Sequence, residues 1–136
     1  MDDELARLRE RRMQEMKEQM DKRAKASPVD VKNLDETHFI EFVATNKFVV
    51  IDFWAEWCGP CRRVGPAIEE LSQEFAGKVA FAKVNTDDNQ RLSMQFNISA
   101  IPAIMLFSNG QLIERIIGAY PKEAIRDKIV RKFNLK

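Results

Sequence analysis

Hydrophobic and polar residues follow two different periods along this chain. From residue 29 onward, short runs rich in Val, Ile and Phe alternate with segments whose apolar positions recur at helical spacing. The expected strands cover residues 29–32, 48–54, 78–85, 103–107 and 111–118, and the expected helices cover residues 35–44, 59–75, 88–96 and 121–133. This order, βαβαβαββα, predicts an α/β fold in which helices flank both faces of a central mixed sheet.

Cap and turn residues support these boundaries. Asp35 is typical of a helix N-cap, and Gly77 is typical of the position where a helix stops. Pro66 is expected to interrupt the helix over residues 59–75, because proline lacks an amide proton. The Asn109-Gly110 pair, which lies between two expected strands, predicts a β-hairpin.

Residues 1–26 differ in composition from the rest of the chain. They carry eight Lys or Arg and seven Asp or Glu residues, with no Gly, Pro or aromatic residue. An apolar stripe predicts an amphipathic helix, although Arg9 and Arg12 interrupt it. The stripe comprises Leu5, Leu8, Met13, Met16, Met20 and Ala24. We expect a charged helical extension over residues 1–26, ended by Ser27-Pro28, and then one domain over residues 27–136.

Net charge and hydropathy narrow the range of partners. The 22 basic and 21 acidic residues give a formal net charge of +1, so no large field favours nucleic acid or an anionic membrane. No apolar stretch approaches the roughly 18 residues of a membrane helix, and the charged first residues differ from a signal peptide. We therefore expect a cytoplasmic monomer that binds neither nucleic acid nor a membrane.

The two cysteines of the chain lie in one short motif, Trp57-Cys58-Gly59-Pro60-Cys61. Because the motif joins a buried strand to a helix, Cys58 is expected at the helix N-terminus, where free amides and the helix dipole stabilise a thiolate. The thiolate is the nucleophile in disulfide exchange, and Cys61 lies close enough in the chain to attack a mixed disulfide on Cys58. Gly59 lets a partner backbone approach, and Pro60 suits the first helical turn.

The segment Asp52-Phe53-Trp54-Ala55-Glu56-Trp57-Cys58-Gly59-Pro60-Cys61 resembles the active-site segment of the thioredoxin family. Further matches follow in order at Pro66 and at residues 82–85, 101–103, 109–110 and 118–119. The resemblance implies the thioredoxin fold and a protein-disulfide reductase with a redox-active Cys58–Cys61 disulfide, without a bound cofactor or metal. It also implies a thioredoxin reductase as electron donor and disulfide-containing client proteins. Arg62, Arg63 and Ala103 depart from the usual residues of the family, which bears on partner preference.

Asp52 is a carboxylate in an otherwise apolar strand, so burial should raise its pKa and suit it to proton transfer. The resemblance implies that Asp52 deprotonates the resolving cysteine, Cys61, and that Lys83 on the next strand is its basic partner. A structural buried ion pair between Asp52 and Lys83 is the alternative, because such pairs also perturb pKa values without catalysis.

The resemblance further implies a substrate-binding surface around the cysteines. Its residues are Trp57, Gly59, Pro60, Ile101, Pro102 and Gly118. The peptide bond before Pro102 is expected to be cis, and the Ile101 backbone is expected to bind an incoming polypeptide by strand addition. The alternative for Pro102 is an ordinary proline at the start of a strand. Trp57 is expected either in an exposed docking patch or packed against Asp87, and Trp54 is expected in the core.

Two other interpretations of the chain remain open. The thiols could bind zinc, but structural zinc takes four ligands and His38 is the single histidine, so two chains would have to share their cysteines. Otherwise His38 is expected on a solvated face, as are Arg62 and Arg63. The second alternative is a thioredoxin-fold binding module that docks to a partner through its N-terminal helix. Methionines on that helix suit an adaptable apolar contact.

Overall fold

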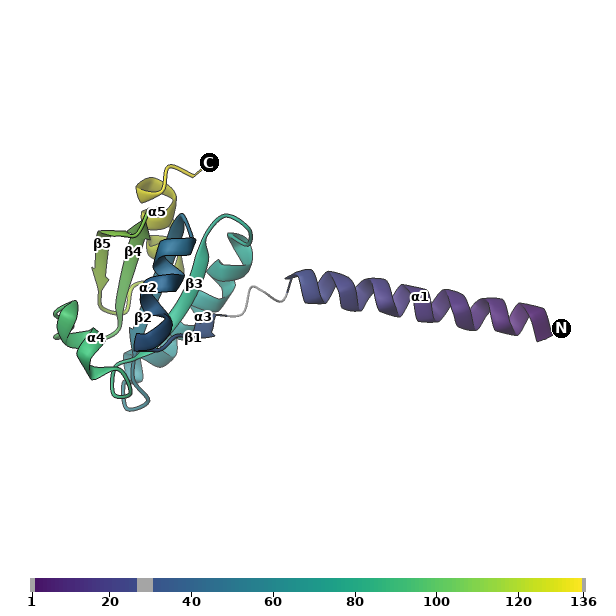
Figure 1. The fold of residues 1–136 in the computed structure, drawn as a ribbon, viewed down its shortest axis with the longest axis horizontal. Helices are drawn as coiled ribbons and strands as arrows, with labels where there is room; N and C mark the ends of the chain where they lie inside the picture. Colours follow the sequence, from purple (N-terminus) through teal and green to yellow (C-terminus); the bar gives the residue numbers. More distant parts are fainter. Residues whose placement is uncertain (1, 27–30, 136) are drawn as a thin grey trace.

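The computed structural model describes the backbone of residues 2–26 and 31–135, and the side chains of residues 3–16 and 31–135 (Figure 1). The elements in chain order are α1 (Asp2–Ala26), β1 (Lys32–Asn33), α2 (Glu36–Thr45), β2 (Phe48–Trp54), α3 (Gly59–Glu74), β3 (Ala80–Asn85), α4 (Gln90–Gln95), β4 (Ala103–Ser108), β5 (Gln111–Ile117) and α5 (Lys122–Lys132). The predicted order of strands and helices is confirmed, including the helix that precedes the first strand.

The five strands form one mixed sheet in the order β1-β3-β2-β4-β5. Strand β3 runs parallel to both β1 and β2, whereas β4 is antiparallel to β2 and β5. The central strand β2 is buried on both faces, which explains why its sequence is nearly continuous in apolar residues. Its one carboxylate, Asp52, is therefore carried into the middle of the sheet.

Two hydrophobic clusters cover the two faces of the sheet. One joins Val50 and other strand residues to α3 and α5, and Ile125 and Ile129 are both fully buried in it. The other joins Val49, Ile51 and Phe53 to α2 and α4. Because side chains of a strand point to alternate faces, Asp52 lies on the same face as Val50, which is the face that packs against α3.

Several boundaries differ from those expected. The first strand was expected at residues 29–32 but lies at Lys32–Asn33, and residues 27–30 are outside the described part. Strand β3 starts at Ala80 because the amides of Lys78 and Val79 both donate to the Phe75 carbonyl. Helix α4 starts late because the Asn85 side chain holds the amides of residues 87 and 88 in a turn.

The expected effects of proline and glycine can be compared with the structure at α3 and at the β4–β5 hairpin. The interruption expected at Pro66 is wrong, because α3 continues through this residue. Gly77, at φ +80°, lies just after the end of α3, as the sequence indicates. Asn109 and Gly110 have φ values of +52° and +82°, and such a pair of left-handed residues matches the twist of the β4–β5 hairpin.

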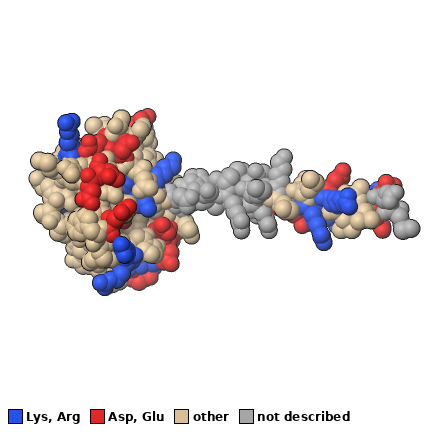
Figure 2. All heavy atoms as spheres, turned by 90° about the horizontal axis from the view of Figure 1, so that it is seen from below, with Lys and Arg blue, Asp and Glu red and all other residues tan. Residues whose placement is uncertain are grey.

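Helix α1 confirms the predicted N-terminal helix, and it exposes the apolar side chains that are described on its stripe. Leu5, Leu8, Met13 and Met16 are 54% to 71% exposed, while Met20 and Ala24 lie outside the described side chains. Among the helices of the described part, none is both long and apolar enough to cross a membrane. Charge is unevenly spread over the domain, since Figure 2 shows Asp and Glu side chains gathered across one face.

Candidate active site

The two cysteines form a disulfide at the start of α3. Cys58 is the N-cap of this helix, and its Cα lies 5.3 Å from the Cα of Cys61. The backbone N–H of Cys61 donates to the Cys58 sulfur at 3.3 Å. Both cysteines are almost completely buried. The helix N-terminus therefore directs an amide at the Cys58 sulfur, which stabilises this sulfur as a thiolate when the disulfide opens.

Asp52 lies on the same side of the sheet as Cys61. It is only 3% exposed, and its Oδ1 has no hydrogen-bond partner within the described residues. Burial raises the pKa of Asp52 to about 7, because the charged form is poorly solvated there, while the positive charge of Lys83 opposes this rise. A carboxyl group with such a pKa exchanges its proton near neutral pH.

Lys83 faces Asp52 from the neighbouring strand. The two residues are register partners in the parallel β2–β3 pair, but no ion pair joins their side chains within the described part. Instead, the Lys83 ammonium lies 5.4 Å from the ring centroid of Trp54, a cation–π distance. Lys83 thus acts on Asp52 through its charge and not through a direct bond.

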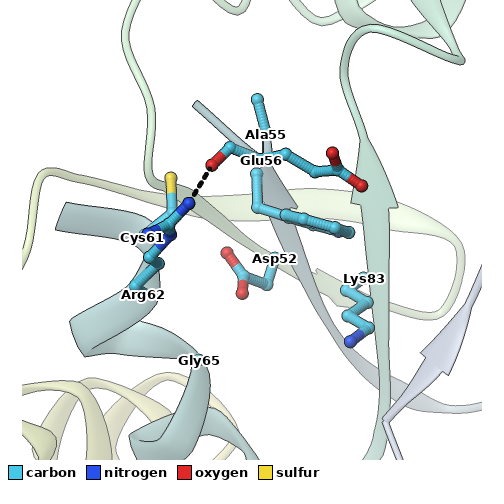
Figure 3. A pocket seen from close by; sticks show the side chains of 8 residues that line it. Asp52, Ala55, Glu56, Cys61, Arg62, Gly65 and Lys83 are labelled. Carbon is cyan, nitrogen blue, oxygen red and sulfur yellow. Dashed lines mark hydrogen bonds between the residues drawn. The ribbon is translucent and has the colours of Figure 1, made fainter. Parts of the chain in front are cut away.

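A cavity of about 360 Å³ connects these groups (Figure 3). It is lined by Asp52, Trp54, Ala55, Glu56, Cys61, Arg62, Gly65 and Lys83. The buried acid, the second cysteine and the nearby ammonium therefore share one small space. Asp52 and Cys61 thus border the same cavity.

Strand β4 approaches the disulfide through a cis peptide bond. The Ile101–Pro102 bond is cis, as the family resemblance implied, and Ile101 packs against Cys58 and Cys61. Gly118, at φ +110°, donates its N–H to the Pro102 carbonyl at 2.9 Å. A side chain at this φ would be strained, so glycine is suited to holding this loop beside Pro102.

Comparisons with known proteins agree with this geometry. The family model described as thioredoxin matches residues 30–131. The chain belongs to the thioredoxin family. It is 43% identical over 101 residues to the chloroplastic M-type thioredoxin of Spinacia oleracea, covering 74% of this chain and 56% of that protein. It is 42% identical over 91 residues to thioredoxin 1 of a Nostoc species, covering 67% of this chain and 85% of that protein.

Solved structures show the same fold. Mitochondrial thioredoxin 3 of Saccharomyces cerevisiae, in its oxidised form, matches with a TM-score of 0.70 at 33% identity, covering 77% of this chain and 98% of that chain. The thioredoxin of Plasmodium falciparum matches with a TM-score of 0.70 at 32% identity, covering 74% and 98% of the two chains. The family makes this chain a thiol-disulfide oxidoreductase, and the Cys58–Cys61 disulfide is consistent with a redox-active pair.

The positions of the two tryptophans in this thioredoxin-family site differ from those expected from the sequence. Trp57 is 71% exposed, and its Nε1 also donates to Asp87 at 2.9 Å, so exposure and the contact with Asp87 both hold. Trp54 is not a core residue as expected. It is half-buried beside the cysteines, because it is the last residue of β2 and its ring lines the cavity.

Sequence reasoning placed Arg62 on a solvated face and missed its contact. The side chain is exposed, but its Nη2 donates to the Glu56 carbonyl at 3.0 Å (Figure 3). Glu56 and Gly65 also line the cavity without having been singled out. The single available signal was that Arg62 follows Cys61 on the first helical turn, and that position alone does not reveal a bond to the preceding loop.

Metal-ligating side chains do not gather in the described residues. No group of three or more His, Cys, Asp or Glu side chains in residues 3–16 and 31–135 is arranged to hold a metal ion. His38 is exposed, as expected, and its Nδ1 lies 2.7 Å from Asp35.

Proposed function

We propose that this chain reduces disulfide bonds of client proteins, with Cys58 as nucleophile and Cys61 as the resolving cysteine. The observation that carries this assignment is the place of Cys58 at the N-cap of α3, where the Cys61 amide points at its sulfur. A thiolate stabilised in this way is the reactive form in disulfide exchange. Cys61 lies within the first turn of α3 and lines the cavity that also contains Asp52.

The reaction then has two steps. In the first, the Cys58 thiolate attacks one sulfur of the client disulfide, a Cys58–client disulfide forms, and the other client sulfur leaves as a thiolate that takes up a proton. In the second, the Cys61 sulfur loses its proton and attacks Cys58. The Cys58–Cys61 disulfide forms, the mixed disulfide breaks, and the client leaves reduced by two electrons.

Asp52 is proposed as the base that takes the proton of Cys61. Both groups line the same cavity, and the raised pKa of Asp52 makes this carboxylate a stronger base than an ordinary one near neutral pH. Lys83 is proposed as its charged partner, since its ammonium favours the ionised carboxylate. Within the described residues no ion pair joins the two side chains, so Lys83 acts on Asp52 through its charge alone.

The client is proposed to bind across the surface formed by Trp57, Gly59, Pro60, Ile101, Pro102 and Gly118. Trp57 and Ile101 line a shallow cavity of about 390 Å³ beside the disulfide. Gly59 and Pro60 are exposed, and the cis bond and the Gly118 loop bring Ile101 next to the cysteines. An extended client segment can pair with the Ile101 backbone, as in strand addition.

Partners and location follow from the family as proposals. A thioredoxin reductase would return the Cys58–Cys61 disulfide to the dithiol, and the clients would be disulfide-containing proteins. We further propose a cytoplasmic monomer without a bound cofactor, with residues 1–26 as an extension and residues 27–136 as the catalytic domain. The exposed stripe of α1 favours a second role, docking of the helix to a partner protein.

Reduction of insulin disulfides by the full chain, with dithiothreitol as the electron source, tests the proposed function. The chain should accelerate the precipitation of insulin B chains, and Cys58→Ser should remove this acceleration. An intact, folded chain that gives no acceleration would leave the binding-module interpretation as the better one.

A further inference from the structure

A hydrogen bond joins two of the residues that line the cavity beside Asp52. Arg62 extends from the first turn of α3, and its guanidinium donates to the backbone carbonyl of Glu56 in the loop between β2 and α3 at 3.0 Å (Figure 3). Both residues line the cavity that also contains Asp52 and Cys61. The bond therefore joins two sides of the cavity and links the helix that carries the resolving cysteine to the preceding loop.

The inner end of this cavity holds an unusual carboxyl group. Asp52 is 3% exposed, yet its Oδ1 lacks a hydrogen-bond partner within the described residues. An unpartnered buried oxygen is sensitive to how much water reaches it. Whatever covers the cavity therefore controls the environment of this carboxyl group.

We propose that Arg62 is a positioning residue for the release step, and that its bridge to Glu56 covers the cavity and limits the access of water to Asp52. The inference rests on the proposed function and deepens it, because it concerns the carboxylate that would accept the proton of Cys61. It assigns a role to a side chain that looks like an ordinary exposed arginine in the sequence.

Two effects of Arg62 on Asp52 have opposite signs, so they can be separated. Its covering effect keeps the carboxyl group desolvated and raises the Asp52 pKa, whereas its positive charge would lower it. Burial is the larger cause of the raised pKa, and Lys83 is the charge that opposes it. Because the guanidinium is exposed, solvent screens its charge. The covering effect should therefore dominate.

Other charged groups around Asp52 are few. Lys83 faces it from β3, Glu56 lies in the adjoining loop, and Arg62 approaches from α3, where Cys61 is held in the uncharged disulfide. On β4, its register partner is Ile104, which carries no charge. Glu56 contributes its backbone carbonyl to the bridge, so the bridge does not depend on the charge of the Glu56 carboxylate.

The decisive experiment is a carboxyl-carbon NMR titration of Asp52 in the oxidised full chain. Arg62→Ala should move the Asp52 titration midpoint to lower pH, by about half a pH unit, because water enters the cavity. Arg62→Lys should keep the midpoint close to that of the unaltered chain, since an ammonium on a long stem can donate to the same carbonyl. The matched control is Arg63→Ala, which removes the neighbouring exposed arginine outside the cavity and should leave the midpoint unchanged.

The proposal would be overturned by an unchanged midpoint in Arg62→Ala, by a midpoint that moves to higher pH, or by an equal shift in Arg63→Ala. An unchanged midpoint would show no covering effect, and a midpoint at higher pH would show that the charge of Arg62 dominates. An equal shift in Arg63→Ala would show an effect that is not specific to Arg62. An Arg62→Lys midpoint equal to that of Arg62→Ala would likewise reject the bridge to the Glu56 carbonyl. Thermal melts of each variant confirm that the compared proteins are folded.

A kinetic measurement connects the cover to the reaction. Reduced protein and 5,5′-dithiobis(2-nitrobenzoate) form a mixed disulfide on Cys58, and the second thionitrobenzoate leaves when Cys61 attacks Cys58 and gives its proton to Asp52. The pH midpoint of this second phase should shift in Arg62→Ala in the same direction as the NMR midpoint, whereas a purely structural role would leave it in place. A wild-type chain without a second phase would contradict the proposed function, while the NMR titration would still decide the role of Arg62.

Discussion

Asp52 and Lys83 are register partners on adjacent parallel strands, yet their side chains form no ion pair within the described part of the chain. Their coupling is a charge effect inside a shared cavity, in which the Lys83 ammonium lies near the Trp54 ring. The buried carboxyl group thus keeps a pKa of about 7, which a close ion pair would have brought down.

Replacing Asp52 by asparagine should stabilise the oxidised protein at alkaline pH. Its pKa is raised from an ordinary 3.8 to about 7, so the carboxyl group destabilises the fold as pH rises through this interval. The loss in the free energy of unfolding reaches its full size above pH 7. At about 1.4 kcal/mol per unit of pKa difference, it amounts to about 4 kcal/mol. Urea unfolding at pH 8 and pH 4 measures it: Asp52→Asn should gain stability at pH 8 and much less at pH 4.

The matched control for this experiment is Asp88→Asn, which removes an exposed carboxylate. Its effect on the free energy of unfolding should be similar at both pH values. If Asp52→Asn were destabilising at pH 8, a structural ion pair with Lys83 would explain the carboxylate better than a buried base.

Replacing Lys83 by methionine should raise the Asp52 pKa further. The ammonium lowers this pKa, and methionine keeps much of the apolar stem while removing the charge. The pH midpoint of the release step should therefore move upward, opposite to the shift expected for Arg62→Ala. The titration of Asp52 by NMR measures the change, with Lys78→Met at an exposed position as control. An unmoved midpoint would mean that Lys83 does not act on Asp52.

The sequence predicts those parts of the site that depend on local chemistry. The bounds of β2, the N-cap position of Cys58 and the Asn109-Gly110 hairpin all follow from residue type and order. The buried state of Asp52 also follows, because a carboxylate in the middle of a central strand cannot avoid the sheet interior.

Contacts between distant segments could not be predicted in the same way. Trp54 was expected in the core because it lies within an apolar strand, but the adjacent cavity leaves it half-buried. The Arg62 bridge depends on a backbone carbonyl, which every residue carries, so no residue type signals it. The first strand is short and has exposed side chains, so its position depends on pairing with β3 and not on its own pattern.

Removal of residues 1–26 should leave the rest of the chain folded and active. The described apolar side chains of α1 are exposed, so their loss removes no core contact. The melting temperature and the insulin reduction rate of the shortened chain should match those of the full chain. Amide exchange in α1 should be faster than in β2, since helix termini and unpacked helices open easily. A large loss of stability, or strong protection in α1, would place the domain boundary elsewhere.

The most direct test of the central claim is to identify which cysteine forms the covalent bond with a client. Reduced Cys61→Ser protein is mixed with a disulfide-bonded substrate, and the adduct is digested without reductant and mapped by mass spectrometry. We predict a stable mixed disulfide on Cys58, because the resolving sulfur is missing and the α3 N-terminus stabilises the Cys58 thiolate. The reduced Cys58→Ser protein should form little adduct under the same conditions. An adduct on Cys61 in Cys58→Ser that forms as fast as the Cys58 adduct would contradict the assignment of nucleophile and resolving cysteine.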